Sequence, residues 1–242
     1  MTSIGAAAAG RSAVRGENGV VASSSALASE IGVDTLRKGG NAVDAAVATA
    51  FALAVTWPTA GNIGGGGFLV YYGADGEATT FDFREKAPLA ATEDMYLGED
   101  GFVRGNSNHE GILAVGVPGT VAGLAMAHGK FGELEWSELV APAVKLASEG
   151  VPISWKLHDD FKERKERWEK YPSSAEIFLK EDGTFYQPGD IWVQKDLGST
   201  LKRIQQRGAD GFYRGQTAKL IADFMAKNGG IITLEDLERY EA

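Results

Sequence analysis

The sequence contains no cysteine, which excludes thiol nucleophiles, disulfide bonds and thiolate metal sites but does not identify the redox compartment. Histidine is nearly as scarce, with 3 residues in 242. His109, His128 and His158 lie far apart in the sequence and show no metal-ligand spacing. We therefore expect neither a metal nor another cofactor.

Positive charge is also in deficit, since the formal net charge is −9. The main basic cluster, Lys162 to Lys170, is interrupted by three glutamates, which is typical of a solvated helix face. Nucleic-acid binders present a basic face, so we do not expect a nucleic-acid partner. Long apolar runs are missing as well: the segment Ala42 to Val55 is too short to span a bilayer and carries Asp44, so we expect no membrane span.

The first residues show no targeting signal, because a few alanines in MTSIGAAAAGRSAVRGENG do not form the apolar core of a signal peptide. We expect residues 1–18 to form a loose lead-in. The remaining length is enough to bury a substantial core, and we expect residues 1–242 to belong to one domain.

The most informative stretch runs from Thr56 to Pro88 and joins a glycine loop to a hairpin. Four consecutive glycines, Gly64 to Gly67, must provide either backbone freedom or close approach, because they have no side chains to pack. A β-branched and aromatic run, a turn and an alternating run follow, which predicts a β-hairpin of Phe68–Tyr72 and Ala78–Phe83. The alternation places Arg84 on the polar face, at the end of the return strand.

Helices are predicted on both sides of the hairpin, which makes the pattern α+β. Residues 26–38 follow a serine cap, and residues 42–55 are apolar enough to be buried on most sides. After the hairpin we expect helices over 120–130, over 138–149 with Ser137 as cap and a kink or restart at Pro142, and over 154–171 with Trp155, Phe161 and Trp168 as apolar anchors. We expect an irregular segment over 172–193, helices over 195–207 and 216–228, and a last helix opened by the capping box at Thr233.

Five segments together resemble the γ-glutamyltransferases, also known as γ-glutamyltranspeptidases or glutathione hydrolases. They are GNAVDAAVATAFAL (40–53), GNIGGGGF (61–68), DFREKAP (82–88), VPGTVAGL (117–124) and KNGGIITLEDLERYEA (227–242). The resemblance runs from about Asn18 to the last residue. It implies an N-terminal-nucleophile hydrolase αββα sandwich, of which this chain would supply only the N-terminal portion of the large subunit.

The resemblance also implies a chemistry and a set of partners. A threonine freed by autocatalytic cleavage would attack a γ-glutamyl amide such as glutathione, and water or an amino acid would accept the γ-glutamyl group. No counterpart of that threonine occurs in these residues, so we expect the chain alone to be inactive and to need the rest of the protein. Bacterial members of the family are usually exported, which favours a periplasmic or extracellular location.

Arg84 is the one substrate-binding residue that we expect in this chain, and we expect no catalytic residue. Its planar fork suits two-point binding of a carboxylate, and in the family the arginine of the matching segment binds the α-carboxylate of the γ-glutamyl donor. The alternative is an ordinary strand-end arginine paired with Asp82 or Glu85. The glycine loop is not followed by a lysine and leads into a strand, so we expect it to pass close to the active-site wall and not to bind phosphate.

Two nucleophile candidates within the chain do not hold. Ser199 to Lys202 matches a Ser-x-x-Lys pattern, but it lies in a predicted amphipathic helix without companion motifs. Thr2 would become N-terminal after loss of Met1, yet the residues that follow it are not typical of a rigid strand.

Two other functions stay open: a non-catalytic binding or scaffold protein that retains half of the fold, and an acylase for another amide, such as a cephalosporin side chain or a poly-γ-glutamate capsule.

Overall fold

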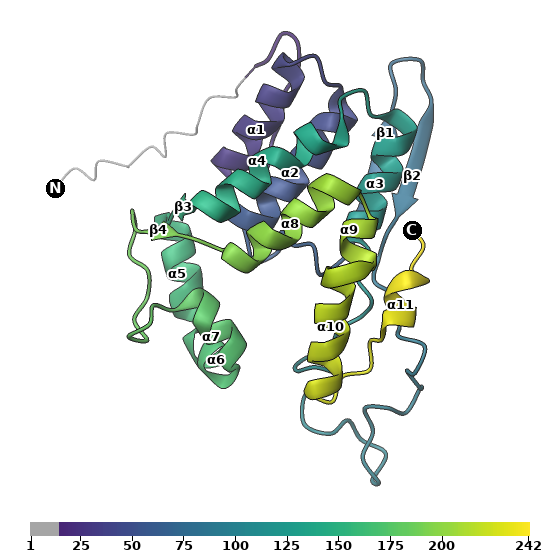
Figure 1. Cartoon of the computed structure of the whole chain (residues 1–242), viewed down its shortest axis with the longest axis vertical. Coiled ribbons are helices and arrows are strands. Elements are labelled where there is room, and N and C mark those ends of the chain that lie inside the picture. The colour runs from purple at the N-terminus through teal and green to yellow at the C-terminus, as the bar shows by residue number, and fades with distance from the viewer. Residues whose placement is uncertain (1–14) are drawn as a thin grey trace, which may run out of the picture.

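The computed structural model describes residues 15–242, so most of the expected lead-in and the Thr2 candidate lie outside the described residues. Residues 15–18 are exposed and belong to no helix or strand. Four long helices form the central part of the core: α1 (Ala26–Arg37), α2 (Ala42–Thr56), α4 (Trp136–Glu149) and α8 (Lys195–Arg207). In Figure 1 these helices lie side by side, with α2 packed between α1 and α4, and α4 packed against α8.

Helix α2 is buried on nearly all sides, as its composition predicts. Val47, Ala48, Phe51 and Val55 are fully buried within the largest apolar cluster. The ring of Phe51 contacts Trp136 of α4 edge to face, with centroids 5.4 Å apart. Asn41 caps this helix, and a capping box with Asp44 satisfies the first backbone N–H groups.

The expected hairpin is confirmed as strands β1 (Phe68–Tyr72) and β2 (Ala78–Asp82), paired antiparallel with Phe68 opposite Asp82. Its inner face carries Phe81 and Phe83, both buried against α3 (Thr120–Phe131). The ring of Phe131 in α3 stacks on Tyr71, with ring centroids 4.0 Å apart. It also contacts Phe81 edge to face, with centroids 6.1 Å apart. In Figure 1 the hairpin stands beside α3 at the edge of the helical layer.

The second half of the chain corrects several expectations. Helix α4 begins at Trp136 with Glu135 at its N-cap, so Ser137 lies inside the first turn and does not cap. The helix does not restart at Pro142 but continues through it, and it packs against both α2 and α8.

The single helix expected over 154–171 is two helices, α5 (Trp155–Glu163) and α6 (Lys165–Lys170). Side chains take the carbonyls that a continuous helix would use: the Arg164 guanidinium donates to Asp160 O at 3.1 Å and the Trp168 indole donates to Phe161 O at 3.2 Å. Phe161 is buried as expected, whereas Trp155 is 74% exposed and anchors nothing.

The segment expected to be irregular, 172–193, contains helix α7 (Pro172–Phe178) and strand β4 (Ile191–Trp192), which pairs antiparallel with β3 (Val151–Pro152). Trp192 is fully buried and donates from its indole to Ile177 O at 2.8 Å. Two-residue strands have no periodicity to recognise, so only this packing reveals them.

The remaining helices are α9 (Asp210–Tyr213), which the sequence did not suggest, α10 (Gly215–Lys227) and α11 (Leu234–Glu238). Helix α11 begins with the expected Thr233 capping box.

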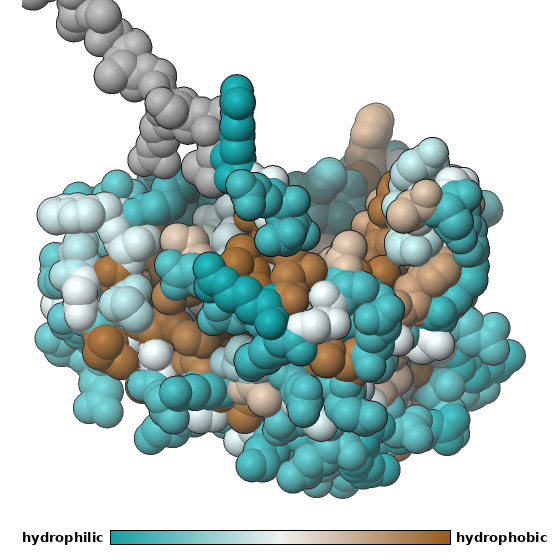
Figure 2. Space-filling model, turned by 90° about the horizontal axis from the view of Figure 1, so that it is seen from above, coloured by the Kyte–Doolittle hydropathy of each residue, from teal (hydrophilic) through white to brown (hydrophobic). Residues whose placement is uncertain are grey.

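None of the helices formed by residues 15–242 is both long enough and apolar enough to cross a membrane. Figure 2 views the molecule from above and shows apolar side chains across the middle of this face, between polar side chains at its edges. On the hairpin, the outer face of β1 is strongly exposed, at 63% for Phe68, 79% for Val70 and 77% for Tyr72.

Candidate substrate-binding site

Arg84 lies two residues beyond the end of β2, on the outer face of the hairpin, as the alternation predicts. Its side chain is exposed, and its Cζ lies 6.0 Å from the centre of the Phe68 ring. Within residues 15–242 no carboxylate lies within 4.0 Å of the Arg84 guanidinium, so neither the pair with Asp82 nor the pair with Glu85 is formed. The Asp82 carboxylate instead accepts the backbone N–H of Arg84 at 3.1 Å.

Hydrogen bonds hold the main chain on both sides of Arg84. Phe83 and Gly67 exchange backbone hydrogen bonds, with Phe83 N donating at 3.0 Å and Gly67 N at 3.3 Å. Lys86 and Val117 form an isolated antiparallel bridge, at 3.2 and 2.8 Å. The exposed guanidinium therefore extends from a backbone that is fixed before and after it.

The glycine loop passes directly behind this backbone. A Cβ at Gly66 would lie 2.4 Å from Phe83 O and 2.9 Å from Arg84 Cα, which no side chain tolerates. None of the four glycines of the run has a left-handed φ. Of the two roles considered for the run, the structure requires close approach at Gly66, whereas a Cβ at Gly64 would meet nothing within 4 Å.

The glycine loop also occupies the N-terminus of α3. Gly65 O accepts the backbone N–H groups of Gly119 at 2.7 Å and of Thr120 at 3.0 Å, which replaces a side-chain cap. These are donors that a phosphate would need at a helix N-terminus. The glycine loop therefore supplies a backbone acceptor at the start of α3.

Two residues near the chain end contact the Arg84 segment, and sequence reasoning missed both contacts. The Tyr240 hydroxyl donates to Arg84 O at 2.7 Å, and the Asp236 carboxylate accepts the backbone N–H of Leu89 at 2.6 Å. Asp236 was recognised only as part of a capping box. No local pattern could reveal contacts between residues about 150 positions apart in the chain.

Other candidate groups lie elsewhere. Ser199 and Lys202 are exposed on α8, within a helix as expected. His128 lies in the last turn of α3, and its Nε2 is 2.8 Å from Leu134 O in the loop that leads to α4. Across residues 15–242 no group of three or more histidine, aspartate or glutamate side chains is arranged to hold a metal ion.

A family model and curated relatives agree with the resemblance shown by the five motifs. A family model described as gamma-glutamyltranspeptidase matches residues 28–242. The glutathione hydrolase proenzyme of Pseudomonas sp. (strain A14) is 47% identical over 97% of this chain and 41% of that protein. The glutathione hydrolase proenzyme of Escherichia coli (strain K12) is 46% identical over 95% of this chain and 40% of that protein.

Among solved structures, that of Helicobacter pylori gamma-glutamyltranspeptidase is similar, with a TM-score of 0.93 and 52% identity over 95% of this chain and 66% of that chain. The chain spans about two fifths of the length of the curated relatives and corresponds to their N-terminal portion. The expected fold class is confirmed: the chain is α+β and forms part of an N-terminal-nucleophile hydrolase fold.

Proposed function

Because this chain belongs to the gamma-glutamyltranspeptidase family, we propose that it is the N-terminal portion of the large subunit of a γ-glutamyltransferase or glutathione hydrolase. The complete enzyme would cleave γ-glutamyl amides, and this portion would bind the donor. The nucleophilic threonine and most of the second sheet would come from the rest of the protein.

One observation supports the binding role most directly, namely that Arg84 is an exposed arginine without an ion-pair partner among residues 15–242 on a firmly held backbone. A planar guanidinium held in this way suits a two-point contact with a carboxylate. In the proposed reaction the α-carboxylate of the donor would bind Arg84. The γ-carbonyl would then lie where the threonine hydroxyl attacks it, the threonine's own α-amine would take the proton, and the amine of the substrate would leave.

The test uses the complete protein that contains residues 1–242. Arg84→Ala should lower kcat/KM for a γ-glutamyl donor by about thirtyfold to a thousandfold, because a charge-assisted contact of roughly 2–4 kcal/mol is lost. Arg84→Lys should recover only part of the loss, since it keeps the charge but not the fork. Arg37→Ala, which removes an exposed arginine of α1, is the matched control and should leave kcat/KM unchanged.

A donor whose α-carboxylate is replaced by an amide makes the comparison decisive. The wild-type enzyme should strongly prefer the acid, and the Arg84→Ala enzyme should have lost that preference. Equal discrimination by both enzymes would refute the assignment of Arg84.

A second experiment separates an enzyme portion from a non-catalytic protein that retains half of the fold. Reading the gene past the codon for Ala242 should reveal the rest of a large subunit and a threonine cleavage site; a stop codon at that point would favour the non-catalytic protein. Purified residues 1–242 should not hydrolyse γ-glutamyl-p-nitroanilide above a blank.

A further inference from the structure

Tyr240 lies just after α11, and its hydroxyl donates to the carbonyl oxygen of Arg84 at 2.7 Å, across 156 positions of sequence. We propose that Tyr240 is a positioning residue for Arg84: it fixes the peptide unit of Arg84 and thereby the direction in which the guanidinium meets the donor's carboxylate. This inference rests on the binding role proposed for Arg84.

The Tyr240 ring is itself held in one place. It is 9% exposed and stacks on Tyr213, with ring centres 5.6 Å apart and planes within 7° of parallel. The Tyr213 hydroxyl donates to Pro118 O at 2.8 Å and accepts the backbone N–H of Ala122 at 3.3 Å. Tyr240 is therefore tied to the start of α3, which also contacts the glycine loop.

Helix α11 is attached to the same segment at a second point. Asp236 accepts the backbone N–H of Leu89 at 2.6 Å and the N–H and hydroxyl of Thr233 at 2.7 and 2.6 Å. The chain from Arg84 to Leu89 is thus bound at both ends by the last turn of the described fold. A single bond would leave this segment free to rotate about it, whereas one bond from α11 and one from the residue just beyond it define both the position and the orientation of the segment.

The hydroxyl of Tyr240 is suited to a permanent donor role. Burial raises its pKa, and the carboxylates of Asp82 and Glu85 raise it further. The group therefore stays protonated at neutral pH and keeps donating to Arg84 O. Two-point recognition depends strongly on the angle of the guanidinium, so a small rotation of this peptide unit weakens carboxylate binding without any change of charge.

The test is Tyr240→Phe in the complete enzyme, which keeps the ring and its stacking and removes only the hydroxyl. KM for the γ-glutamyl donor should rise about three- to tenfold, the scale of one neutral hydrogen bond, with little change in kcat. The matched control is Tyr96→Phe, which removes another hydroxyl that donates to a backbone carbonyl, Leu113 O at 2.9 Å. The control should leave KM unchanged, and the two variants should melt at similar temperatures.

A double-mutant cycle separates this inference from the role of Arg84 itself. In the Arg84→Ala background, Tyr240→Phe should change KM less than twofold, because its effect acts through Arg84. An equal effect in both backgrounds, or none in the wild type, would overturn the positioning role while leaving the carboxylate role of Arg84 intact. An Arg84→Ala enzyme with unchanged kcat/KM would instead overturn the carboxylate-binding role proposed for Arg84.

Discussion

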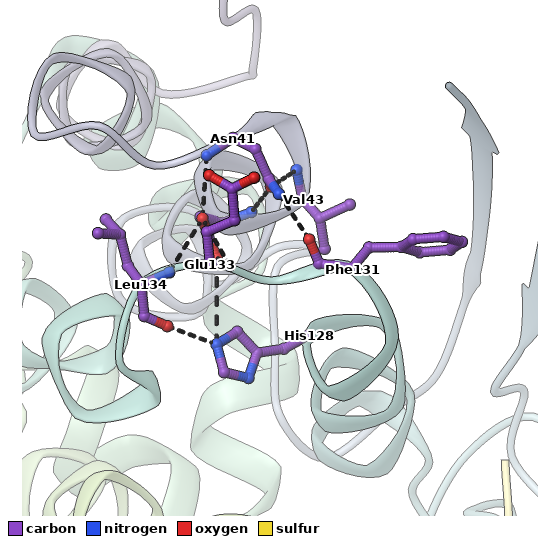
Figure 3. A network of polar contacts seen from close by, with 7 residues as sticks. Asn41, Val43, His128, Phe131, Glu133 and Leu134 are labelled. Atoms are coloured by element: carbon purple, nitrogen blue, oxygen red, sulfur yellow. Dashed lines mark hydrogen bonds and ion pairs between the residues drawn. The ribbon is translucent and has the colours of Figure 1, made fainter. Parts of the chain in front are cut away.

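Two charged residues of this chain, Asp44 and Arg84, occupy contrasting environments. Asp44 is fully buried at the start of α2, and Figure 3 shows the network around it: backbone N–H groups of Asn41, Glu133 and Leu134 donate to the Asp44 carboxylate. Their distances range from 2.9 to 3.3 Å. Arg84 is exposed, and all the hydrogen bonds described around it involve its main chain.

The difference separates a charge that the fold satisfies from a charge that has no ion-pair partner among residues 15–242. The fold itself satisfies the Asp44 carboxylate, which joins the N-terminus of α2 to the loop between α3 and α4; the Asn41 amide adds a bond to Phe131 O at 2.5 Å. At Arg84 the hydrogen bonds are made by the main chain, and the guanidinium is exposed to solvent. A backbone fixed on both sides of an exposed guanidinium is the arrangement on which the binding role proposed for Arg84 rests.

The largest expected effect is on the free energy of unfolding and concerns the buried carboxylate of Asp44. Asp44→Ala should lower the free energy of unfolding by about 3 kcal/mol, because buried N–H donors lose their acceptor. Denaturant unfolding of the chain measures this loss. Asp34→Ala, in an exposed pair with Arg37 on α1, should cost less than about 0.5 kcal/mol. Equal losses for the two variants would contradict a structural role for Asp44.

The next prediction tests how tightly the backbone near Arg84 is packed. Gly123 and Gly129 both lie in α3, but a Cβ at Gly123 would lie 2.0 Å from Cγ of Phe83, whereas one at Gly129 would meet nothing within 4 Å. Gly123→Ala should therefore destabilise the chain by about 1–3 kcal/mol through overpacking. Gly129→Ala should stabilise it by about 0.5–1 kcal/mol, as alanine does in a helix. Thermal unfolding of the pair should show shifts of opposite sign.

Asp236 gives a pH test of the contacts behind Arg84. Burial works to raise its pKa, but hydrogen bonds from Leu89 and Thr233 outweigh it and hold the pKa below the ordinary value of 3.8. A lowered pKa in the folded state means that the stabilisation is complete above the unfolded value and is lost as the pH falls below it. The difference in unfolding free energy between wild type and Asp236→Asn should therefore shrink as the pH is lowered from 7 to 2.5. A constant difference would contradict the assignment.

The smallest expected effect on stability concerns the outer face of the hairpin. Val70 is 79% exposed there, and we expect residues 1–242 in isolation to self-associate through this apolar face. Val70→Thr should reduce association measured by sedimentation while changing the unfolding free energy by less than about 0.5 kcal/mol. Ile191→Thr, on the exposed side of β4, is the control and should leave association unchanged. A concentration-independent monomer for the wild-type chain would contradict the prediction.

Local chemistry was sufficient to predict several parts of this protein. The cap at Asn41, the buried composition of α2, the alternation through Arg84 and the capping box at Thr233 are all short-range patterns, and each is present in the structure. The five motifs likewise indicated the family before any fold was known. Such features depend on neighbours within a few residues, so the sequence contains them directly.

Other properties were decided only by tertiary packing. Whether Gly66 serves φ freedom or close approach depended on Phe83 and Arg84 lying behind it. The break between α5 and α6 depended on which side chains took the Asp160 and Phe161 carbonyls. The contact of Tyr240 with Arg84 joins residues that no sequence periodicity links. Each of these depends on groups that come together only when distant parts of the chain pack against one another, which is why the sequence by itself placed Arg84 on its strand but not the residues that hold it there.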